Sequence, residues 1–266
     1  MLSLQERVLL LTRMSEKCIV AGSAQSTNRK GWKRHKVTCS FICNPPALTL
    51  GDYTEPVVVL VTFRKRIYFE TLFRDLLNEL IARSKYIEAT SPERLADILV
   101  EEKPTAILIS DDTIMAEKYD AVRRKFMEFA KSGGTVLFCC WFAGTCDADL
   151  MGFMFHQEWD LPWKKPRMTE QTFRLNPYRW SKLHAIEELP QKFNMRGYYL
   201  KWAMKEDAVY VTSAERRENQ PWWVHDRGRS PVLFTPTGLG WVGYVGDDYV
   251  APGLAQIICG LCGLLG

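Results

Sequence analysis

The chain has 266 residues, of which 47% are hydrophobic and 25% are charged. This composition is typical of a globular protein with a buried core, and it excludes a fibrous or largely disordered chain. The formal net charge is +4 at pH 7, and one short run accounts for it, with positive charges at Arg29, Lys30, Lys33, Arg34 and Lys36. We interpret this run as a solvated segment, with an anionic partner as the alternative, and the sequence does not favour binding to nucleic acid.

Cysteine usage and the N-terminal segment indicate the compartment. The eight cysteines are irregularly spaced, and the first residues lack the charged, apolar and small-residue order of a secretion signal. Three consecutive leucines at positions 9 to 11 are flanked by Glu6, Arg7 and Arg13, so the segment falls short of the roughly 20 apolar residues that span a bilayer. We predict a soluble, cytoplasmic protein with reduced thiols and no membrane partner.

The first part of the chain differs from the rest. Residues 1–50 show no sustained hydrophobic period, and Asn44, Pro45 and Pro46 mark a break before the first strong pattern. We predict a basic, flexible extension over residues 1–55 and one main domain over residues 56–266, with the boundary near Glu55.

Strand and helix patterns alternate from residue 57 onward. Residues 57–61 (VVVLV) form a continuous apolar run, typical of a strand that is covered on both faces of a parallel sheet. Apolar residues then recur at three- and four-residue spacing from Phe69 to Ile81, which predicts a helix. Its exposed face offers two supporting ion pairs, Glu70 with Arg74 and Glu79 with Arg83.

The same unit repeats twice. Ser91 before Pro92 predicts a helix start, residues 106–109 a buried strand, and residues 119–129 a second amphipathic helix that Gly133 and Gly134 end. Residues 135–142 then predict a third apolar strand. This order predicts an α/β fold with a mostly parallel, flavodoxin-like sheet and helices on both faces.

The pattern is looser after Gly144. We predict aromatic-rich loops there, including residues 156–163, followed by strands over residues 208–212 and 231–234. A turn at residues 238–240 leads into a strand over residues 241–246, and an apolar helix begins at about Gly253.

Ligands of an open parallel sheet lie beyond the carboxyl ends of its strands. That rule selects four segments here, at residues 62–66, 110–112, 139–145 and 246–248. In the third of these, Cys140 is a candidate nucleophile, because a thiol on a turn between a strand and a helix can become reactive. The alternative is a buried cysteine that acts as a plain hydrophobic residue, since Cys140 stands between Cys139 and the bulky Trp141 rather than between small residues.

A nucleophilic cysteine needs a base. His156 with Glu158 offers an imidazole and a carboxylate together, and His225 beside Asp226 offers the same. His35 and His184 complete the set of four histidines. The sequence does not rank these residues by distance.

Other motifs carry weaker predictions. The acidic pair Asp111 and Asp112 could bind sugar hydroxyls or a cation, although capping of the next helix is the simpler role. Tryptophans at positions 159, 163, 222 and 223 form either an aromatic wall for a ligand or part of the core. We predict no metal site, because neither residues 35–43 nor the pair Cys259 and Cys262 supply a complete ligand set. We also predict no cofactor, because phosphate-binding glycine motifs are missing.

Three stretches, residues 133–140, 159–164 and 231–247, resemble the class I glutamine amidotransferase-like fold and, within it, the trehalose-utilisation-like (ThuA-like) branch, whose relatives are common in fungi. The resemblance covers residues 56–266 and places the family's nucleophile at Cys140. The late His-x-Glu of working amidotransferases would fall at Gly246, Asp247 and Asp248, where this chain has no histidine. The resemblance therefore implies a degenerate member that does not hydrolyse glutamine.

Three functions remain open from the sequence. The first is the binding of a small polar ligand, such as a carbohydrate, at the strand ends, with Ser110, Asp111, Asp112, Trp141, Asp247 and Asp248 as contacts. The second is a hydrolase or sugar-modifying enzyme that uses Cys140 with His156 and Glu158. The third is a protein-interaction module that uses the basic extension. We favour the first, and the sequence leaves open whether the protein is an enzyme and whether it forms a homo-oligomer.

Overall fold

The computed structural model describes residues 55–164, 168–176, 186–212, 229–247 and 249–265. The predicted extension over residues 1–55 lies outside this part of the chain, apart from Glu55, and so do His35, His184, His225, Trp222, Trp223 and Asp248. Among the described residues, no helix is long and apolar enough to cross a bilayer.

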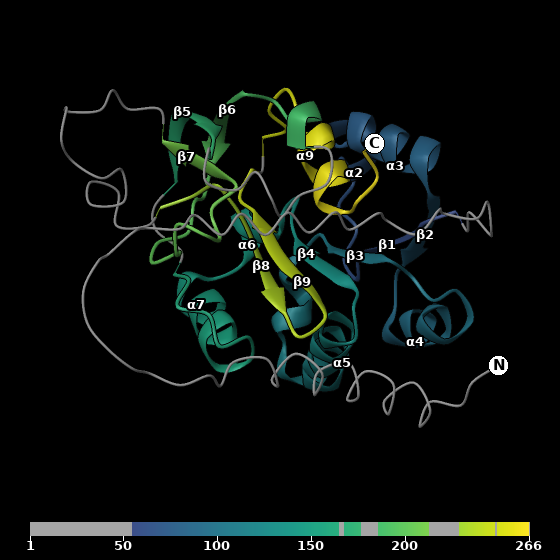
Figure 1. The fold of residues 1–266 in the computed structure, drawn as a ribbon. Helices are drawn as coiled ribbons and strands as arrows, with labels where there is room; N and C mark the ends of the chain where they lie inside the picture. Colours follow the sequence, from purple (N-terminus) through teal and green to yellow (C-terminus); the bar gives the residue numbers. More distant parts are fainter. Residues whose placement is uncertain (1–54, 165–167, 177–185, 213–228, 248, 266) are drawn as a thin grey trace, which may run out of the picture. The chain divides into compact units, whose positions relative to one another are not determined.

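A six-stranded sheet forms the centre of the domain (Figure 1), with strand order β2-β1-β3-β4-β9-β8. Its first five strands run parallel to their neighbours, and β8 pairs antiparallel with β9. The order of the parallel strands is that of the flavodoxin-like doubly wound fold, which confirms the predicted fold class. The bounds are β1 Val57–Val61, β2 Lys85–Ala89, β3 Ala106–Ile109, β4 Thr135–Phe138, β8 Val232–Thr237 and β9 Gly240–Val245.

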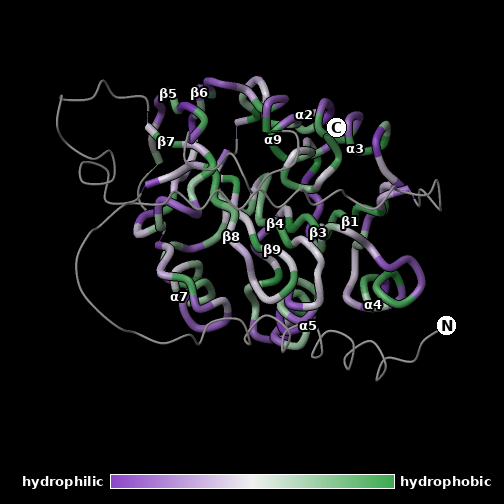
Figure 2. Tube along the Cα trace, viewed as in Figure 1, coloured by the Kyte–Doolittle hydropathy of each residue, from purple (hydrophilic) through white to green (hydrophobic). Residues whose placement is uncertain are grey.

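Helices cover both faces of this sheet. One face carries α2 (Phe69–Leu72), α3 (Arg74–Arg83) and α9 (Leu254–Leu261), and the other carries α4 (Pro92–Glu101), α5 (Asp120–Lys131) and α7 (Ala148–Gln157). Side chains alternate between the two faces along each strand. Leu60, Leu108 and Leu137 therefore join the first apolar cluster, and Val61, Ile109 and Phe138 join the second. Figure 2 shows hydrophobic residues along the central strands.

Local signals define several element ends as predicted. The Ser91 hydroxyl accepts a hydrogen bond from the Arg94 amide at 3.2 Å, which caps α4, and Pro92 occupies its first turn. Gly133 has a φ of +120°, which suits the turn after α5. Gly238 has a φ of +61° in the turn that joins β8 to β9.

Three predictions of secondary structure need correction, and one strand of the main sheet was missed. The predicted helix over residues 69–81 is interrupted at Phe73 and forms α2 and α3. The strand from Thr135 ends at Phe138 rather than at residue 142, because the chain turns there and α6 (Phe142–Thr145) follows. The segment after Gly144, predicted as loops, contains α7, which Asp147 caps through its carboxylate. The sequence analysis also missed β2.

A second sheet of three strands has the order β6-β5-β7 and is antiparallel. It consists of β5 (Thr169–Leu175), β6 (Lys192–Gly197) and β7 (Tyr210–Thr212), and only β7 was predicted. Isolated bridges join its neighbourhood to the main sheet, including Gly197 with Asp247 and Ala208 with Leu233. Three short 3₁₀ helices complete the described elements, η1 (Asp112–Met115), η2 (Glu117–Tyr119) and η4 (Ile186–Glu188).

Burial of the Cys259 thiol in α9 should make the fold less stable at alkaline pH. Burial raises the pKa of Cys259 from 9.0 to about 11, with a smaller contribution from the charge of Glu79. An acid whose pKa is higher in the folded state stabilises the fold fully below the unfolded pKa, and this contribution disappears as the pH rises to the folded pKa. We expect Cys259 to contribute a loss of about 2–3 kcal/mol in the free energy of unfolding between pH 9 and 11.

Urea unfolding at a series of pH values measures this effect. In the Cys259→Ala variant, that part of the loss between pH 9 and 11 should disappear, while other buried acids keep their own share. The same alkaline loss in the variant and in the wild type would contradict this origin.

Candidate ligand site at the strand ends

The carboxyl ends of the parallel strands bring the four predicted segments to one edge of the main sheet. The strand order reverses between β1 and β3, and ligands of doubly wound sheets bind next to such a reversal. Two contacts join the segments that follow these strands. The Ser110 hydroxyl donates to the carbonyl of Val61 at 3.0 Å, and the amide of Arg64 donates to a carboxylate oxygen of Asp111 at 3.4 Å.

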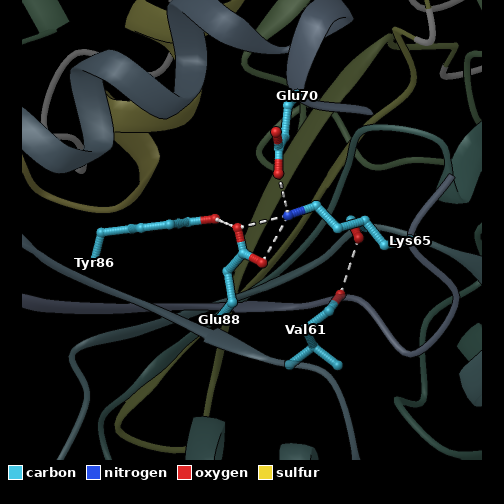
Figure 3. Close-up of polar contacts among 6 residues, drawn as sticks. Val61, Lys65, Glu70, Tyr86 and Glu88 are labelled. Carbon is cyan, nitrogen blue, oxygen red and sulfur yellow. Dashed lines mark hydrogen bonds and ion pairs between the residues drawn. The ribbon is translucent and has the colours of Figure 1, made fainter. Parts of the chain in front are cut away.

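A group of four polar side chains lies on the β1–β2 side of this reversal (Figure 3), and we call Lys65, Glu70, Tyr86 and Glu88 the Lys65 cluster. The Lys65 ammonium contacts Glu70 at 2.8 Å and the two carboxylate oxygens of Glu88 at 2.9 and 3.1 Å. The Tyr86 hydroxyl donates to Glu88 at 2.8 Å. Tyr86 and Glu88 come from β2, Lys65 from the segment after β1, and Glu70 from α2, so the fold assembles the cluster from three separate parts of the chain.

The contacts within the cluster favour the charged forms of Lys65 and Glu70. Burial lowers the pKa of Lys65, but the hydrogen bonds and negative charges of Glu70 and Glu88 together outweigh burial and raise it. The hydrogen bond from Lys65, followed by its positive charge, lowers the pKa of Glu70. Burial, followed by the hydrogen bond to Glu88, raises the pKa of Tyr86. Near neutral pH the cluster therefore offers the ammonium of Lys65 as a donor, the carboxylate of Glu70 as an acceptor and a protonated phenol at Tyr86.

Cys140 lies on the turn between β4 and α6, and its backbone has a φ of +55°. A left-handed conformation is uncommon for any residue other than glycine, and it recurs where a strand turns sharply to present a nucleophile. The side chain is nevertheless fully buried, and its thiol lies 3.7 Å from that of Cys139. The hydrogen bond with Cys140, together with burial, raises the pKa of Cys139 well above its ordinary value, which disfavours the reactive thiolate there.

Trp141 connects this turn to the segment after β1. Its ring contacts Phe69 and Phe73 edge-on, with centroids 5.6 and 5.8 Å apart. The guanidinium of Arg66 lies 5.2 Å from the centroid of the same ring, at a distance that permits a cation–π interaction. Trp141 follows Cys140 directly in the chain, and Phe69, which its ring contacts, precedes Glu70 of the Lys65 cluster, so the turn and the cluster are neighbours.

The predicted acidic contacts have structural roles in this structure. Asp111 accepts from the amide of Thr113 at 2.8 Å and caps η1, which is the simpler of its two predicted roles. Asp112 is partly buried in the first turn of η1. Asp247 is fully buried and accepts from the amides of Tyr249 at 2.9 Å and Ala251 at 2.6 Å, which stabilises the turn after β9. Whether any of these groups also contacts a ligand stays a prediction.

His156 and Glu158 lie at the end of α7, on the face opposite to the apolar cluster that contains Cys140. Glu158 pairs with Arg123 of α5 at 2.8 Å, and the same guanidinium also donates to Asp120 and to the carbonyl of Ile114. Within the described ranges, no contact joins Cys140 to either residue. Their partnership with Cys140 therefore stays a prediction without a contact to support it.

The sequence analysis selected the segment that contains Lys65 but missed the rest of the cluster. Tyr86 and Glu88 belong to β2, whose five residues (KYIEA) alternate only weakly in hydropathy. Glu70 was assigned to an ion pair with Arg74, whereas the structure pairs it with Lys65. The predicted pair of Glu79 with Arg83 is confirmed at 2.6 Å.

The sequence and the structure of the chain were compared with those of known proteins. No protein-family model and no curated protein sequence matches the chain. Solved structures do. A β-galactosidase from Bacillus circulans sp. alkalophilus is 13% identical with a TM-score of 0.46, and the match covers 79% of this chain and 31% of that one. A putative ThuA-like protein from Bacteroides uniformis is 11% identical with a TM-score of 0.47, covering 80% of this chain and 91% of that one.

A cytoplasmic protein from Salmonella typhimurium is also similar, at 13% identity and a TM-score of 0.49, with 79% of this chain and 98% of that one covered. The chain spans about a third of the length of the β-galactosidases that it matches. The ThuA-like resemblance predicted from the sequence thus has a counterpart among solved structures. The assignment of the fold itself rests on the strand order of the main sheet.

Proposed function

We propose that the protein binds a small polar ligand, of which a carbohydrate is the best-fitting class, at the strand ends beside the Lys65 cluster. The observation that carries the proposal is the cluster itself, because it gathers donors and acceptors from three parts of the chain at the edge where this fold binds ligands. Lys65 and Glu88 keep 30% and 28% of their side chains exposed, so both remain accessible to a ligand.

A carbohydrate matches these groups in two ways. Its hydroxyls can donate to the carboxylates of Glu70 and Glu88 and accept from the ammonium of Lys65, and such hydrogen bonds to charged groups are the stronger kind. Its apolar ring face can pack against an aromatic side chain, and the half-buried ring of Trp141 is nearby. A few polar groups beside an aromatic wall are typical of a small-molecule site.

Binding fits this site better than glutamine hydrolysis does. The thiol of Cys140 is fully buried. The positions that correspond to the family's late His-x-Glu carry Gly246 and Asp247, and the carboxylate of Asp247 accepts from two backbone amides. A general base next to Cys140 is thus not supplied by this part of the chain.

A hydrolase or sugar-modifying enzyme that uses Cys140 is the second candidate. The left-handed backbone of Cys140 favours it, because strained residues concentrate at active sites. An interaction module built on the basic extension is a third candidate, and its residues lie outside the described part of the chain.

Calorimetric titration with a panel of neutral mono- and disaccharides tests the binding proposal, together with thermal stabilisation by the same sugars. We expect one or more sugars to bind, and the Glu88→Gln variant to bind them at least about tenfold more weakly, since hydrogen bonds to charged groups contribute about 1.5–3 kcal/mol. Glu102→Gln is a matched control, because Glu102 also pairs with a lysine, Lys85, and has a similar exposure of 24%.

Glu102 follows α4 and pairs with Lys85, the first residue of β2. It therefore lies at the end of β2 opposite to Glu88. Its substitution should leave sugar binding unchanged. The proposal fails if no sugar in the panel binds at millimolar concentration, or if Glu88→Gln and Glu102→Gln have the same affinity as the wild type.

A further inference from the structure

A hollow of about 340 Å³ lies away from the strand-end site and is lined by His156, Pro162, Trp163, Lys164 and Trp202. We call it the Trp163 hollow. His156 comes from the end of α7, and the other residues come from two segments that pair through their backbones. The amide of Lys164 donates to the carbonyl of Lys201 at 3.1 Å, and the amide of Lys201 donates back at 2.8 Å. These bonds place Lys201 opposite Lys164, and Trp202 follows directly after this pair.

Among the residues that the structure describes, none hydrogen-bonds to the indole nitrogen of Trp163, although the Trp163 side chain is completely buried. Buried donors are almost always paired, and an unpaired one costs free energy that a suitable acceptor would recover. The ring of Trp163 is fixed by Phe155, whose centroid lies 5.1 Å away. Trp163 is one of the residues that line the hollow, and its fixed ring carries this unpaired donor.

Trp202 is the second unusual residue of this hollow. Its backbone has a φ of +66°, and 52% of its surface remains exposed to solvent. A large aromatic side chain in the left-handed region is a true outlier, and such strain recurs where a protein clamps a ligand. A ligand that covered the ring of Trp202 would remove this aromatic surface from water, which is favourable.

The charges around the hollow are of one sign or neutral. Lys164 places its aliphatic stem next to Gly152 of α7, where a Cβ atom would lie 3.9 Å from its Cγ. None of the ion pairs found among the described residues uses the ammonium of Lys164, and the described part of the lining contains no Asp or Glu. A negatively charged acceptor is thus the complementary group.

We propose that the Trp163 hollow binds a small ring-bearing carboxylate. The carboxylate accepts from the indole N–H of Trp163 and pairs with Lys164, and the ring packs against Trp202 and Pro162. The volume lies at the lower end of the roughly 300–1,000 Å³ that is usual for ligand sites, so it suits one ring with a short substituent. An arylacetic acid and a sugar acid share this chemistry, and the test separates them. This site is distinct from the proposed sugar site in both position and residues.

The experiment uses phenylacetate and glucuronate, with 2-phenylethanol and methyl glucoside as their neutral counterparts. Each is titrated into the full-length protein by calorimetry, and the tryptophan indole N–H signals are followed by nitrogen-15 NMR. Trp163→Phe identifies the signal of Trp163. We expect at least one carboxylate to bind and to shift that signal downfield, with the neutral counterpart binding more weakly.

Two exposed positions keep the proposal testable if Trp163→Phe does not fold. Lys164→Gln should weaken carboxylate binding about fivefold and leave the neutral counterpart unchanged, as for a solvent-accessible ion pair. Trp202→Ala should weaken both about fivefold to tenfold, because it removes the packing of the ring. Lys192→Gln, at an exposed position of β6 outside the hollow, is the control and should have no effect.

Binding of phenylacetate alone would identify an aromatic ligand, and binding of glucuronate alone a sugar acid, and either result supports the proposal. It is overturned if neither carboxylate moves the Trp163 signal at millimolar concentration, or if the neutral compounds bind as tightly as the acids. It is also overturned if Lys164→Gln has no more effect than Lys192→Gln.

Discussion

Cys139 and Cys140 should react with iodoacetamide at least about 100-fold more slowly in the native protein than in the unfolded chain, because a buried thiol reacts only during local opening. Both side chains are fully buried. For Cys139, the hydrogen bond with Cys140 and burial also raise the pKa, which reduces the thiolate fraction that reacts. Alkylation followed by fragment mass spectrometry assigns the rate to each residue.

This measurement decides between the two main candidate functions. Slow reaction at both positions fits a binding protein in which the turn after β4 is a packing element. Rapid alkylation of Cys140 alone at neutral pH, as fast as for an exposed thiol, would contradict our expectation and support the hydrolase candidate. Cys262 is an internal reference for the reaction rate of a buried thiol. Burial raises its pKa, and it lies in the turn after α9 rather than in the turn after β4.

The Gly246→Ala variant should lose at least about 3–4 kcal/mol of its free energy of unfolding, a loss that is rare for a single substitution. A Cβ atom at this position would lie only 1.6 Å from the carbonyl oxygen of Tyr198, and backbone atoms cannot move aside cheaply. The clash falls where the amide of Tyr198 donates to the carbonyl of Gly246 at 2.8 Å. Urea unfolding, or the yield of folded protein if the variant is too unstable, measures the effect.

Gly152→Ala provides a matched control. Gly152 lies within α7, and the nearest heavy atom to an added Cβ is the flexible Cγ of Lys164 at 3.9 Å, so we expect no loss and a gain of about 0.5–1 kcal/mol from the higher helix propensity of alanine. If Gly246→Ala is as stable as Gly152→Ala, the close approach of the two backbones at the end of β9 is not required for the fold.

The Gly152→Ala control also lies next to the Trp163 hollow. The stem of Lys164 lies over this glycine, next to the Trp163 hollow. Gly152→Ala should therefore be checked for carboxylate binding as well as for stability. We expect binding to be unchanged, because the contact that it creates is an ordinary van der Waals distance.

The sequence alone determined the parallel core of this protein. Continuous apolar runs predicted β1 and β3 with their observed bounds, since a strand covered on both faces must be hydrophobic at every position. Periodic apolar residues and local caps predicted α4 and α5. These signals are local and can be recognised without knowledge of the fold. Their alternation was sufficient to predict the α/β class and the strand-end edge at which we place the candidate site.

The tertiary structure decided the elements with weaker local signals. The strand β2 is exposed at one of its five positions and only partly buried at three others, so it lacks the apolar run that identified its neighbours. The helix α7 has two methionines and two phenylalanines among its ten residues, and one apolar face was not evident beside the aromatic segment that follows. Packing against the sheet selected a strand in one case and a helix in the other.

The candidate sites also needed the fold. Lys65 was within a predicted segment, but Tyr86 and Glu88 reach it only because β2 pairs in parallel with β1. His156 and Glu158 are two residues apart and yet serve different contacts, one at the Trp163 hollow and the other with Arg123. Sequence spacing predicts which residues share an element, whereas contacts between elements depend on pairing register and side-chain direction, which are fixed only when the whole core packs.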